Sequence, residues 1–129
     1  MDYNKPFNFL KKLPPKLNSF YKTKSKSSLV VSNKSKSKKD FDPVTNFDKA
    51  FEKFIRSLIN KNFPKDAIIG EEFEDKFSFN DCKWSIDPID GTRAFVIGAP
   101  TWSNLISLSF EERSLIGLAN FPELDKYYI

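Results

Sequence analysis

Residues 84–93 constrain the fold of this chain more than any other segment. They read Trp-Ser-Ile-Asp-Pro-Ile-Asp-Gly-Thr-Arg and place Asp87 and Asp90 three positions apart. On a straight strand an odd spacing points two side chains to opposite faces of the sheet, because side chains alternate along the strand. Pro88 has a fixed φ angle and no N–H group to donate to a neighbouring strand. We therefore predict that a strand ends near Asp87 and that a turn follows it.

The residues after Asp90 predict a short helix. Gly91 permits a tight backbone, and Thr92 is a natural N-cap for a helix that begins at Arg93. Carboxylate and carbonyl oxygens suit hard cations such as Mg²⁺, whereas unpaired amides at a helix start suit a phosphate. This combination indicates a phosphoryl-transfer site. Taken alone, however, Asp-Pro-x-Asp-Gly is equally a good turn sequence.

The composition excludes several kinds of catalytic site. The chain of 129 residues has no histidine and a single cysteine, Cys82. Ser-His and Cys-His nucleophilic catalysis therefore cannot occur, and neither an internal disulfide nor a thiolate zinc cluster can form. Catalysis must use carboxylates, hydroxyls and a bound metal. We expect a cytoplasmic protein without a membrane span, since no stretch approaches the roughly 20 apolar residues that a span requires.

The charges are unevenly distributed along the chain. Residues 1–39 hold eleven lysines and one acid, whereas residues 40–129 hold ten basic and sixteen acidic side chains. We therefore predict a basic N-terminal arm (1–39), with a partial helix and strand, and an acidic folded part (40–129). Lysine runs also neutralise nucleic-acid phosphates. Residues 22–39 offer neither arginine nor stacking aromatics, so we do not expect a nucleic-acid partner.

The apolar pattern predicts an α+β fold with helices packed on a largely antiparallel sheet. We expect Pro14-Pro15 to interrupt any helix in the first part of the chain. Thr45 and Asp48 resemble a capping box at the start of a second helix, in which we assign Glu52 and Arg56 to the polar face. Short connections between the later strands favour antiparallel pairing. The predicted strands cover residues 29–32, 67–70, 82–86, 102–110, 115–120 and 126–129.

Several blocks of the sequence resemble the inositol monophosphatase family of Mg²⁺-dependent, lithium-sensitive phosphomonoesterases. In order, they are residues 42–45 (Asp-Pro-Val-Thr), Asp48, residues 70–72 (Gly-Glu-Glu) and residues 87–92 (Asp-Pro-Ile-Asp-Gly-Thr). Residues 90–102 look more like the histidinol-phosphatase branch than the inositol branch. The resemblance implies that residues 40–129 form the N-terminal subdomain of a metal-dependent phosphatase.

The resemblance also implies a metal site. Two or three Mg²⁺ ions occupy the complete family site, and the residues that match its ligands here are Glu71, Asp87, Asp90 and the backbone carbonyl of Ile89. Without the resemblance, adjacent Glu71 and Glu72 are explained as a solvated pair.

Catalytic roles follow from the same resemblance. It implies that Asp48 and Thr92 form a hydrogen-bonded pair that, with Glu71, positions the attacking water. The amides of Gly91 and Thr92 are expected to hold the phosphate. Spacing alone explains Asp48 equally well as the acid of a helix start. The implied substrate is a small phosphorylated metabolite, histidinol phosphate of histidine biosynthesis, with inositol 1-phosphate or a related sugar phosphate as the alternative.

One part of the family pattern has no match. Family members carry a further metal-binding aspartate in a Trp-Asp motif of the C-terminal half, and Asp125 lies too early to replace it. We therefore expect an N-terminal fragment or a truncated relative of such an enzyme. A catalytically incomplete remnant that acts as a binding module is the alternative. The resemblance also allows a homodimer.

Overall fold

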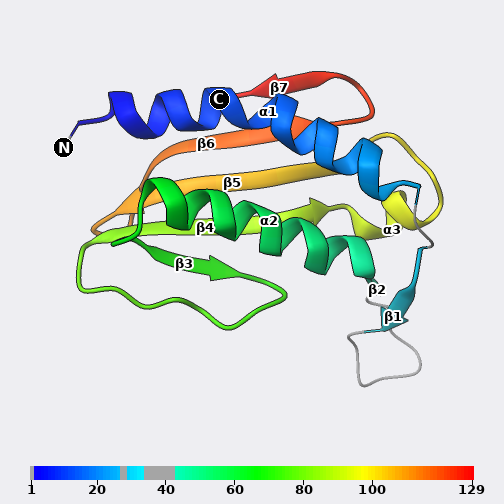
Figure 1. Ribbon diagram of the computed structural model, residues 1–129, viewed down its shortest axis with the longest axis horizontal. Helices are drawn as coiled ribbons and strands as arrows, with labels where there is room; N and C mark the ends of the chain where they lie inside the picture. Colours follow the sequence, from blue (N-terminus) through cyan, green and yellow to red (C-terminus); the bar gives the residue numbers. More distant parts are fainter. Residues whose placement is uncertain (1, 27–28, 34–42) are drawn as a thin grey trace.

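The computed structural model describes residues 2–26, 29–33 and 43–129. Figure 1 shows two long helices in front of a sheet, with the strands running nearly parallel to the helices. The elements are α1 (Asn4–Lys24), β1 (Val31–Asn33), β2 (Pro43–Thr45), α2 (Asn46–Asn62), β3 (Ala67–Gly70), β4 (Cys82–Asp90), α3 (Thr92–Val96), β5 (Ser103–Phe110), β6 (Arg113–Phe121) and β7 (Lys126–Tyr128).

Five strands form the main sheet, in the order β3-β4-β5-β6-β7. β3 and β4 are parallel, and the other neighbouring strands of this sheet are antiparallel. β1 and β2 form a separate antiparallel pair. The predicted α+β fold with a largely antiparallel sheet is therefore confirmed.

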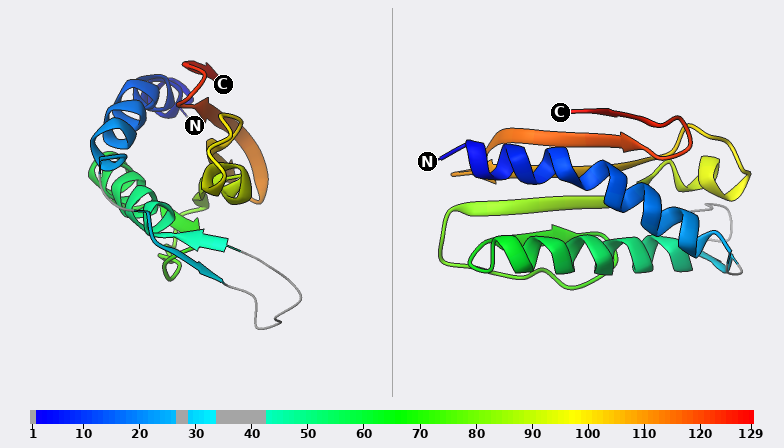
Figure 2. Two further views of the ribbon diagram at one scale, coloured as in Figure 1. Left: turned by 90° about the vertical axis from the view of Figure 1, so that its right-hand side faces the viewer. Right: turned by 45° about the horizontal axis from the view of Figure 1, so that its top comes forward.

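α1 and α2 cover the same face of the sheet, as the end-on view in Figure 2 shows. Alternate residues of β4 and β5 point toward these helices and are buried there. The core includes Leu10, Leu13 and Leu17 of α1, Phe51, Ile55 and Ile59 of α2, Trp84, Ile86, Ile106 and Leu108 of the sheet, and Trp102 just before β5.

The expectation that Pro14-Pro15 interrupts the first helix is wrong, because α1 runs through both residues. A proline inside a helix removes a backbone hydrogen bond and costs about 3 kcal/mol. Leu10, Leu13 and Leu17 are almost completely buried, and Pro14 is buried beside them. Full burial of one leucine side chain contributes about 1.5–3 kcal/mol. Packing against the core therefore offsets the local cost and sets the length of this helix.

α2 begins as predicted. The Thr45 side chain accepts hydrogen bonds from the N–H groups of Phe47 and Asp48, and the Asp48 carboxylate accepts one from the Thr45 N–H at 2.7 Å. The assignment of Glu52 to the polar face is wrong, because Glu52 is fully buried.

The prediction that the strand of residues 82–86 ends near Asp87 is also wrong. β4 continues through Pro88 to Asp90. Its pairing with β3 ends at Ile86, so from Asp87 onward β4 pairs in this sheet with β5 alone. Proline is tolerated in a strand where its missing N–H would face an unpaired side. The early end of β3 therefore explains why Pro88 does not stop β4.

Some sequence predictions fall outside the described residues. These are the boundary between residues 39 and 40, Asp42 of the first family block, and the lysines of residues 34–39. The division into two parts therefore stays a prediction, although α1 shares one core with α2 and the sheet. Among the helices that the structure describes, none combines the length and apolar character needed to cross a bilayer.

Candidate active site

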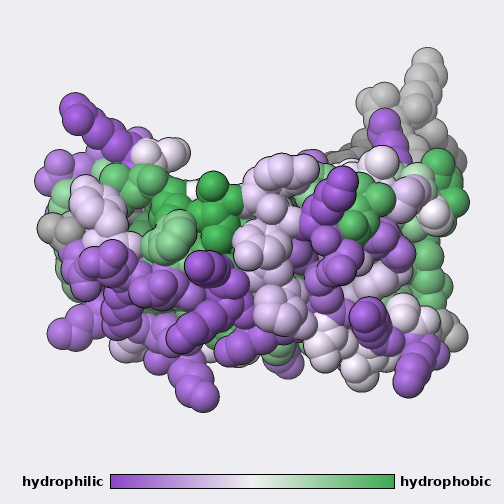
Figure 3. All heavy atoms as spheres, turned by 90° about the horizontal axis from the view of Figure 1, so that it is seen from above, coloured by the Kyte–Doolittle hydropathy of each residue, from purple (hydrophilic) through white to green (hydrophobic). Residues whose placement is uncertain are grey.

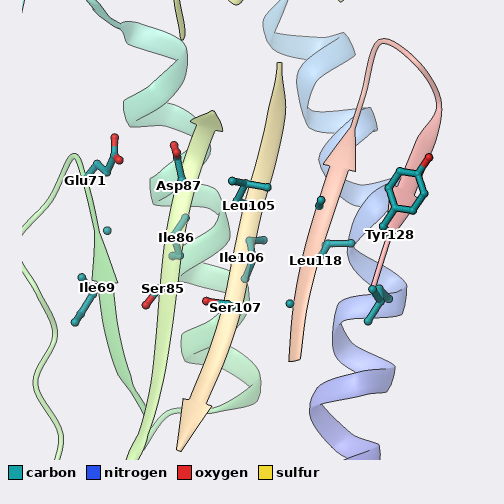
Figure 4. A pocket seen from close by; sticks show the side chains of 14 residues that line it. Ile69, Glu71, Ser85, Ile86, Asp87, Leu105, Ile106, Ser107, Leu118 and Tyr128 are labelled. Atoms are coloured by element: carbon teal, nitrogen blue, oxygen red, sulfur yellow. The ribbon is translucent and has the colours of Figure 1, made fainter. Parts of the chain in front are cut away.

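Glu71 and Asp87 lie at the same end of two neighbouring parallel strands. Glu71 follows β3 directly, and Asp87 is the residue after the last pairing between β3 and β4. Figure 4 shows both carboxylates at this end, with α1 and α2 behind the strands. The parallel pairing therefore brings together acids that are sixteen positions apart in the sequence.

A β-bulge places Asp90 on the same side of the sheet as Asp87. Asp87 is paired opposite Leu105 and Asp90 opposite Ser103, so three steps along β4 match two steps along β5. Leu105 and Ser103 face the same side because they are two residues apart. The two acids opposite them share that side. The extra residue of the bulge therefore brings the two acids to one side of the sheet, the result that we expected from a turn.

Asp87 is a half-buried acid among like charges. Burial is the main cause that raises the pKa of its carboxyl group, to about 7, and the carboxylates of Glu71, Asp90 and Asp48 raise it further, as does a hydrogen bond with Asp90. Its Oδ1 atom is buried without a hydrogen-bond partner. Such an oxygen is costly to bury unpaired. A nearby cation would favour the charged carboxylate and provide Oδ1 with a partner.

The acids fit a divalent cation in part. Carboxylate oxygens are the ligands that Mg²⁺ prefers, and the unpaired Oδ1 of Asp87 is such an oxygen. However, within the described residues no three acidic or cysteine side chains lie close enough together to form a cation site as they stand. Glu71, Asp87 and Asp90 are near enough for their charges to interact, and like charges repel one another. The acids therefore lie near one another without forming a complete cation site as they stand.

Asp48 connects α2 to this group. Its Oδ1 accepts a hydrogen bond from Thr92 Oγ1 at 3.2 Å, while its Oδ2 is held by Thr45. Thr92 Oγ1 also lies 3.0 Å from the carbonyl oxygen of Ile89. Its single proton is donated to one of these two acceptors at a time. The expected contact between Asp48 and Thr92 is present, and their catalytic role stays a prediction.

The N-cap of α3 is Gly91 and not Thr92, which corrects the sequence prediction. Gly91 has φ +80° and ψ +45°, and Thr92 is the first helical residue. Glycine adopts this left-handed conformation without the steric cost that other residues incur. The expectation that the amides of Gly91 and Thr92 hold a phosphate stays a prediction.

A buried amide network, which was not predicted from the sequence, supports the bulge. Asn104, opposite the bulge, donates from Nδ2 to the Pro88 carbonyl at 2.7 Å. Asn120 donates to Asn104 Oδ1 and to Asn18 Oδ1, at 3.0 Å in each case. The available signal was a polar residue on the same strand face as Ile106 and Leu108, where an apolar one is expected.

We expect Asn104→Ala to lower the free energy of unfolding by about 2 kcal/mol, because it leaves the buried Pro88 carbonyl without its donor. Urea unfolding of the chain measures this loss. Asn18→Ala is the matched control at the half-exposed end of the same network. It should cost less than about 1 kcal/mol, because water replaces the lost partner there. Equal losses for the two variants would contradict a specific role of Asn104 at the bulge.

An apolar hollow adjoins the acids on the face of the sheet opposite the helices. Figure 3 shows a hollowed, hydrophobic area bordered by hydrophilic side chains. The hollow is lined by Leu105, Gly117, Ala119 and Tyr128, with Glu71 and Asp87 among the lining residues (Figure 4). Apolar neighbours replace water around Asp87, which accords with burial as the main cause of its raised pKa, whereas Glu71 and Asp90 are exposed.

Solved structures define the class of fold. A structure of the extragenic suppressor protein suhB from Bartonella henselae superposes with a TM-score of 0.83 at 25% identity, and the match covers 94% of this chain and 46% of that one. A staphylococcal IMPase complexed with products gives a TM-score of 0.85 at 18% identity, over 99% of this chain and 48% of that one. The chain therefore has the fold of one half of these proteins.

The chain belongs to the inositol monophosphatase family, whose model matches residues 11–129. A histidinol-phosphatase from Chlorobaculum parvum is 45% identical over 92 residues, which cover 71% of this chain and 36% of the relative. A histidinol-phosphatase from Mycobacterium tuberculosis is 38% identical over 89 residues, 69% of this chain and 34% of the relative. The matched part thus spans about a third of the length of these relatives.

Proposed function

We propose that this chain forms the metal- and phosphate-binding part of a Mg²⁺-dependent phosphomonoesterase that hydrolyses histidinol phosphate. The observation that carries the proposal is the unpaired, buried Oδ1 of Asp87 among the carboxylates of Glu71, Asp90 and Asp48. The membership of the family supports hydrolysis of a phosphate ester. A related IMPase/NADP phosphatase has been solved complexed with Mg²⁺ and phosphate, which supports the choice of metal.

In this proposal Glu71, Asp87, Asp90 and the Ile89 carbonyl hold the metal. When bound, Mg²⁺ would supply Lewis-acid polarisation of the phosphate and of the attacking water. The amides of Gly91 and Thr92 bind phosphate oxygens beside it. These residues together orient a phosphorus centre next to the acids.

Thr92 and Asp48 carry the proton away from the attacking water. When Thr92 Oγ1 donates to Asp48 Oδ1, its lone pairs are left to accept a hydrogen bond from water. Glu71 orients the same water from the end of β3. Asp48 is almost completely buried and is held by Thr45, so the acceptor that it offers to Thr92 is fixed in place.

The choice of substrate follows from the two histidinol-phosphatase relatives at 45% and 38% identity. Inositol 1-phosphate is the second candidate, because a fructose-1,6-bisphosphatase/inositol-1-monophosphatase from Aquifex aeolicus is 36% identical over 93 residues. Both substrates are phosphate monoesters, and the acids would act on the group they share.

A phosphate-release assay on the purified protein tests the proposal. We expect Mg²⁺-dependent release that is faster from histidinol phosphate than from inositol 1-phosphate, and its loss when EDTA removes the metal. Equal and negligible release from both substrates would contradict the substrate assignment. Binding of Mg²⁺ without any release would instead favour a binding module that has kept the fold.

A further inference from the structure

The backbone that carries Glu71 is held by two side chains of α2. Glu52, which is fully buried, accepts a hydrogen bond on Oε2 from the Glu72 N–H at 2.6 Å. Its Oε1 accepts from Arg56 Nε at 2.9 Å. Arg56 Nη2 in turn donates to the Phe73 carbonyl at 3.2 Å. We call Glu52 and Arg56 the α2 clamp, because they form hydrogen bonds with the backbone of the two residues that follow Glu71.

Gly70, on the other side of Glu71, lies directly against this clamp. A Cβ atom added at Gly70 would be 2.0 Å from Glu52 Oε1 and 2.5 Å from Glu52 Cδ. These distances are far inside van der Waals contact, so any larger residue would displace the carboxylate. The glycine is therefore required by the close approach of Glu52, and the clamp touches the chain before and after Glu71.

We propose that Glu52 and Arg56 are positioning residues that fix the direction of the Glu71 carboxylate toward Asp87. The inference rests on the proposed role of Glu71 as a Mg²⁺ ligand. A buried ion pair gives little net stability compared with apolar residues of the same volume, whereas partners that orient metal ligands typically change metal affinity 10–100-fold. The ion pair with Arg56 also compensates the negative charge of Glu52 and keeps its carboxylate directed at the backbone that follows Glu71.

The test measures Mg²⁺ affinity by titration calorimetry on the 129-residue chain. Glu52→Gln keeps the volume but loses one of the two acceptors, and we expect the Kd for Mg²⁺ to rise about tenfold. Gly70→Ala should give a similar rise without changing any charge, because it expels the same carboxylate. The double variant should bind Mg²⁺ no more weakly than the weaker-binding single variant, since both changes disrupt the same contacts of the Glu52 carboxylate.

Asp66→Asn is the matched structural control. Asp66 is a buried carboxylate at the opposite end of β3, where it accepts from Trp84 Nε1 at 2.9 Å and from Asn80 Nδ2 at 2.8 Å. This variant should lower Tm but leave the Kd for Mg²⁺ within about twofold. Unchanged Mg²⁺ affinity in both Glu52→Gln and Gly70→Ala would overturn the proposal. If Glu52→Gln does not fold, the Kd values of Gly70→Ala and Arg56→Lys for Mg²⁺ test the proposal instead.

Amide hydrogen exchange provides a readout that needs no metal. In Glu52→Gln the Glu72 amide should exchange faster, while the Ile68 amide, which donates to the Lys76 carbonyl at 2.9 Å, should stay protected. A wild-type chain that does not bind Mg²⁺ would count against the proposed function and not against the clamp. In that case selective exposure of the Glu72 amide supports the clamp, and unchanged exchange overturns it.

Discussion

Asp90→Asn and Glu71→Gln are each expected to lower kcat for phosphate release by more than about a hundredfold. Substitution of a residue that only supports a metal ligand already costs up to about a hundredfold, and these two are proposed as direct ligands. Each variant removes one negative charge from the carboxylates that surround Asp87. We therefore also expect the metal-free chain to become more stable, because repulsion between like charges falls.

The two effects separate a metal ligand from a structural acid. In the wild-type chain, Mg²⁺ at 100 times its Kd should add about 2.7 kcal/mol to the free energy of unfolding. In Asp90→Asn and Glu71→Gln this gain should nearly vanish. Thermal unfolding with and without Mg²⁺, together with steady-state kinetics, measures both effects.

Cys82→Ser is the control for this pair of variants. Cys82 is half-buried at the start of β4, far along the strand from Asp87. Its substitution should leave kcat and the Mg²⁺-induced gain in stability nearly unchanged. If Glu71→Gln or Asp90→Asn kept both wild-type turnover and the wild-type response to Mg²⁺, the assignment of metal ligands would be wrong.

The elements that were predictable from sequence are those whose signals are local. α2 carries its own start signal, because Thr45 and Asp48 satisfy each other within one turn. α1 was misjudged because the cost of Pro14-Pro15 is local, whereas the burial that offsets it depends on residues far away in the sequence. β4 was misjudged for a similar reason. Whether Pro88 ends the strand depends on where β3 stops pairing.

In the candidate site, too, the residues with local sequence signals were predicted and those with distant partners were not. The acids were identified because each family block is contiguous in the sequence, and the structure brings Glu71 and Asp87, from two of these blocks, to one end of the sheet. Glu52 and Asn104 were missed because their partners lie 20 and 16 residues away. Asn104 occupies a strand position where the alternation predicts an apolar side chain, whereas the apolar pattern of α2 placed Glu52 on the polar face. A polar residue on a predicted apolar face is therefore the sequence signal of a supporting contact for Asn104, and Glu52 gave no such signal.

Thr92→Val is expected to lower kcat by about a thousandfold and to leave Mg²⁺ affinity and KM nearly unchanged. The variant removes the hydroxyl that donates to Asp48 Oδ1 and would accept from the attacking water, and loss of such proton transfer typically costs 10²–10⁴-fold. Because Gly91 and not Thr92 caps α3, the loss should not act through the helix start. Asp48 also keeps both contacts with Thr45.

Thr92→Ser is the matched control, because serine keeps the hydroxyl and loses only a methyl group. It should retain kcat within about tenfold, or about 1.4 kcal/mol of activation free energy. Steady-state kinetics with histidinol phosphate and calorimetric titration with Mg²⁺ separate the outcomes. A loss of Mg²⁺ affinity in Thr92→Val would show that the hydroxyl acts by orienting the Ile89 carbonyl, 3.0 Å away. Equal kcat values for valine and serine would remove Thr92 from the proton pathway, since the hydroxyl is what distinguishes the two side chains there.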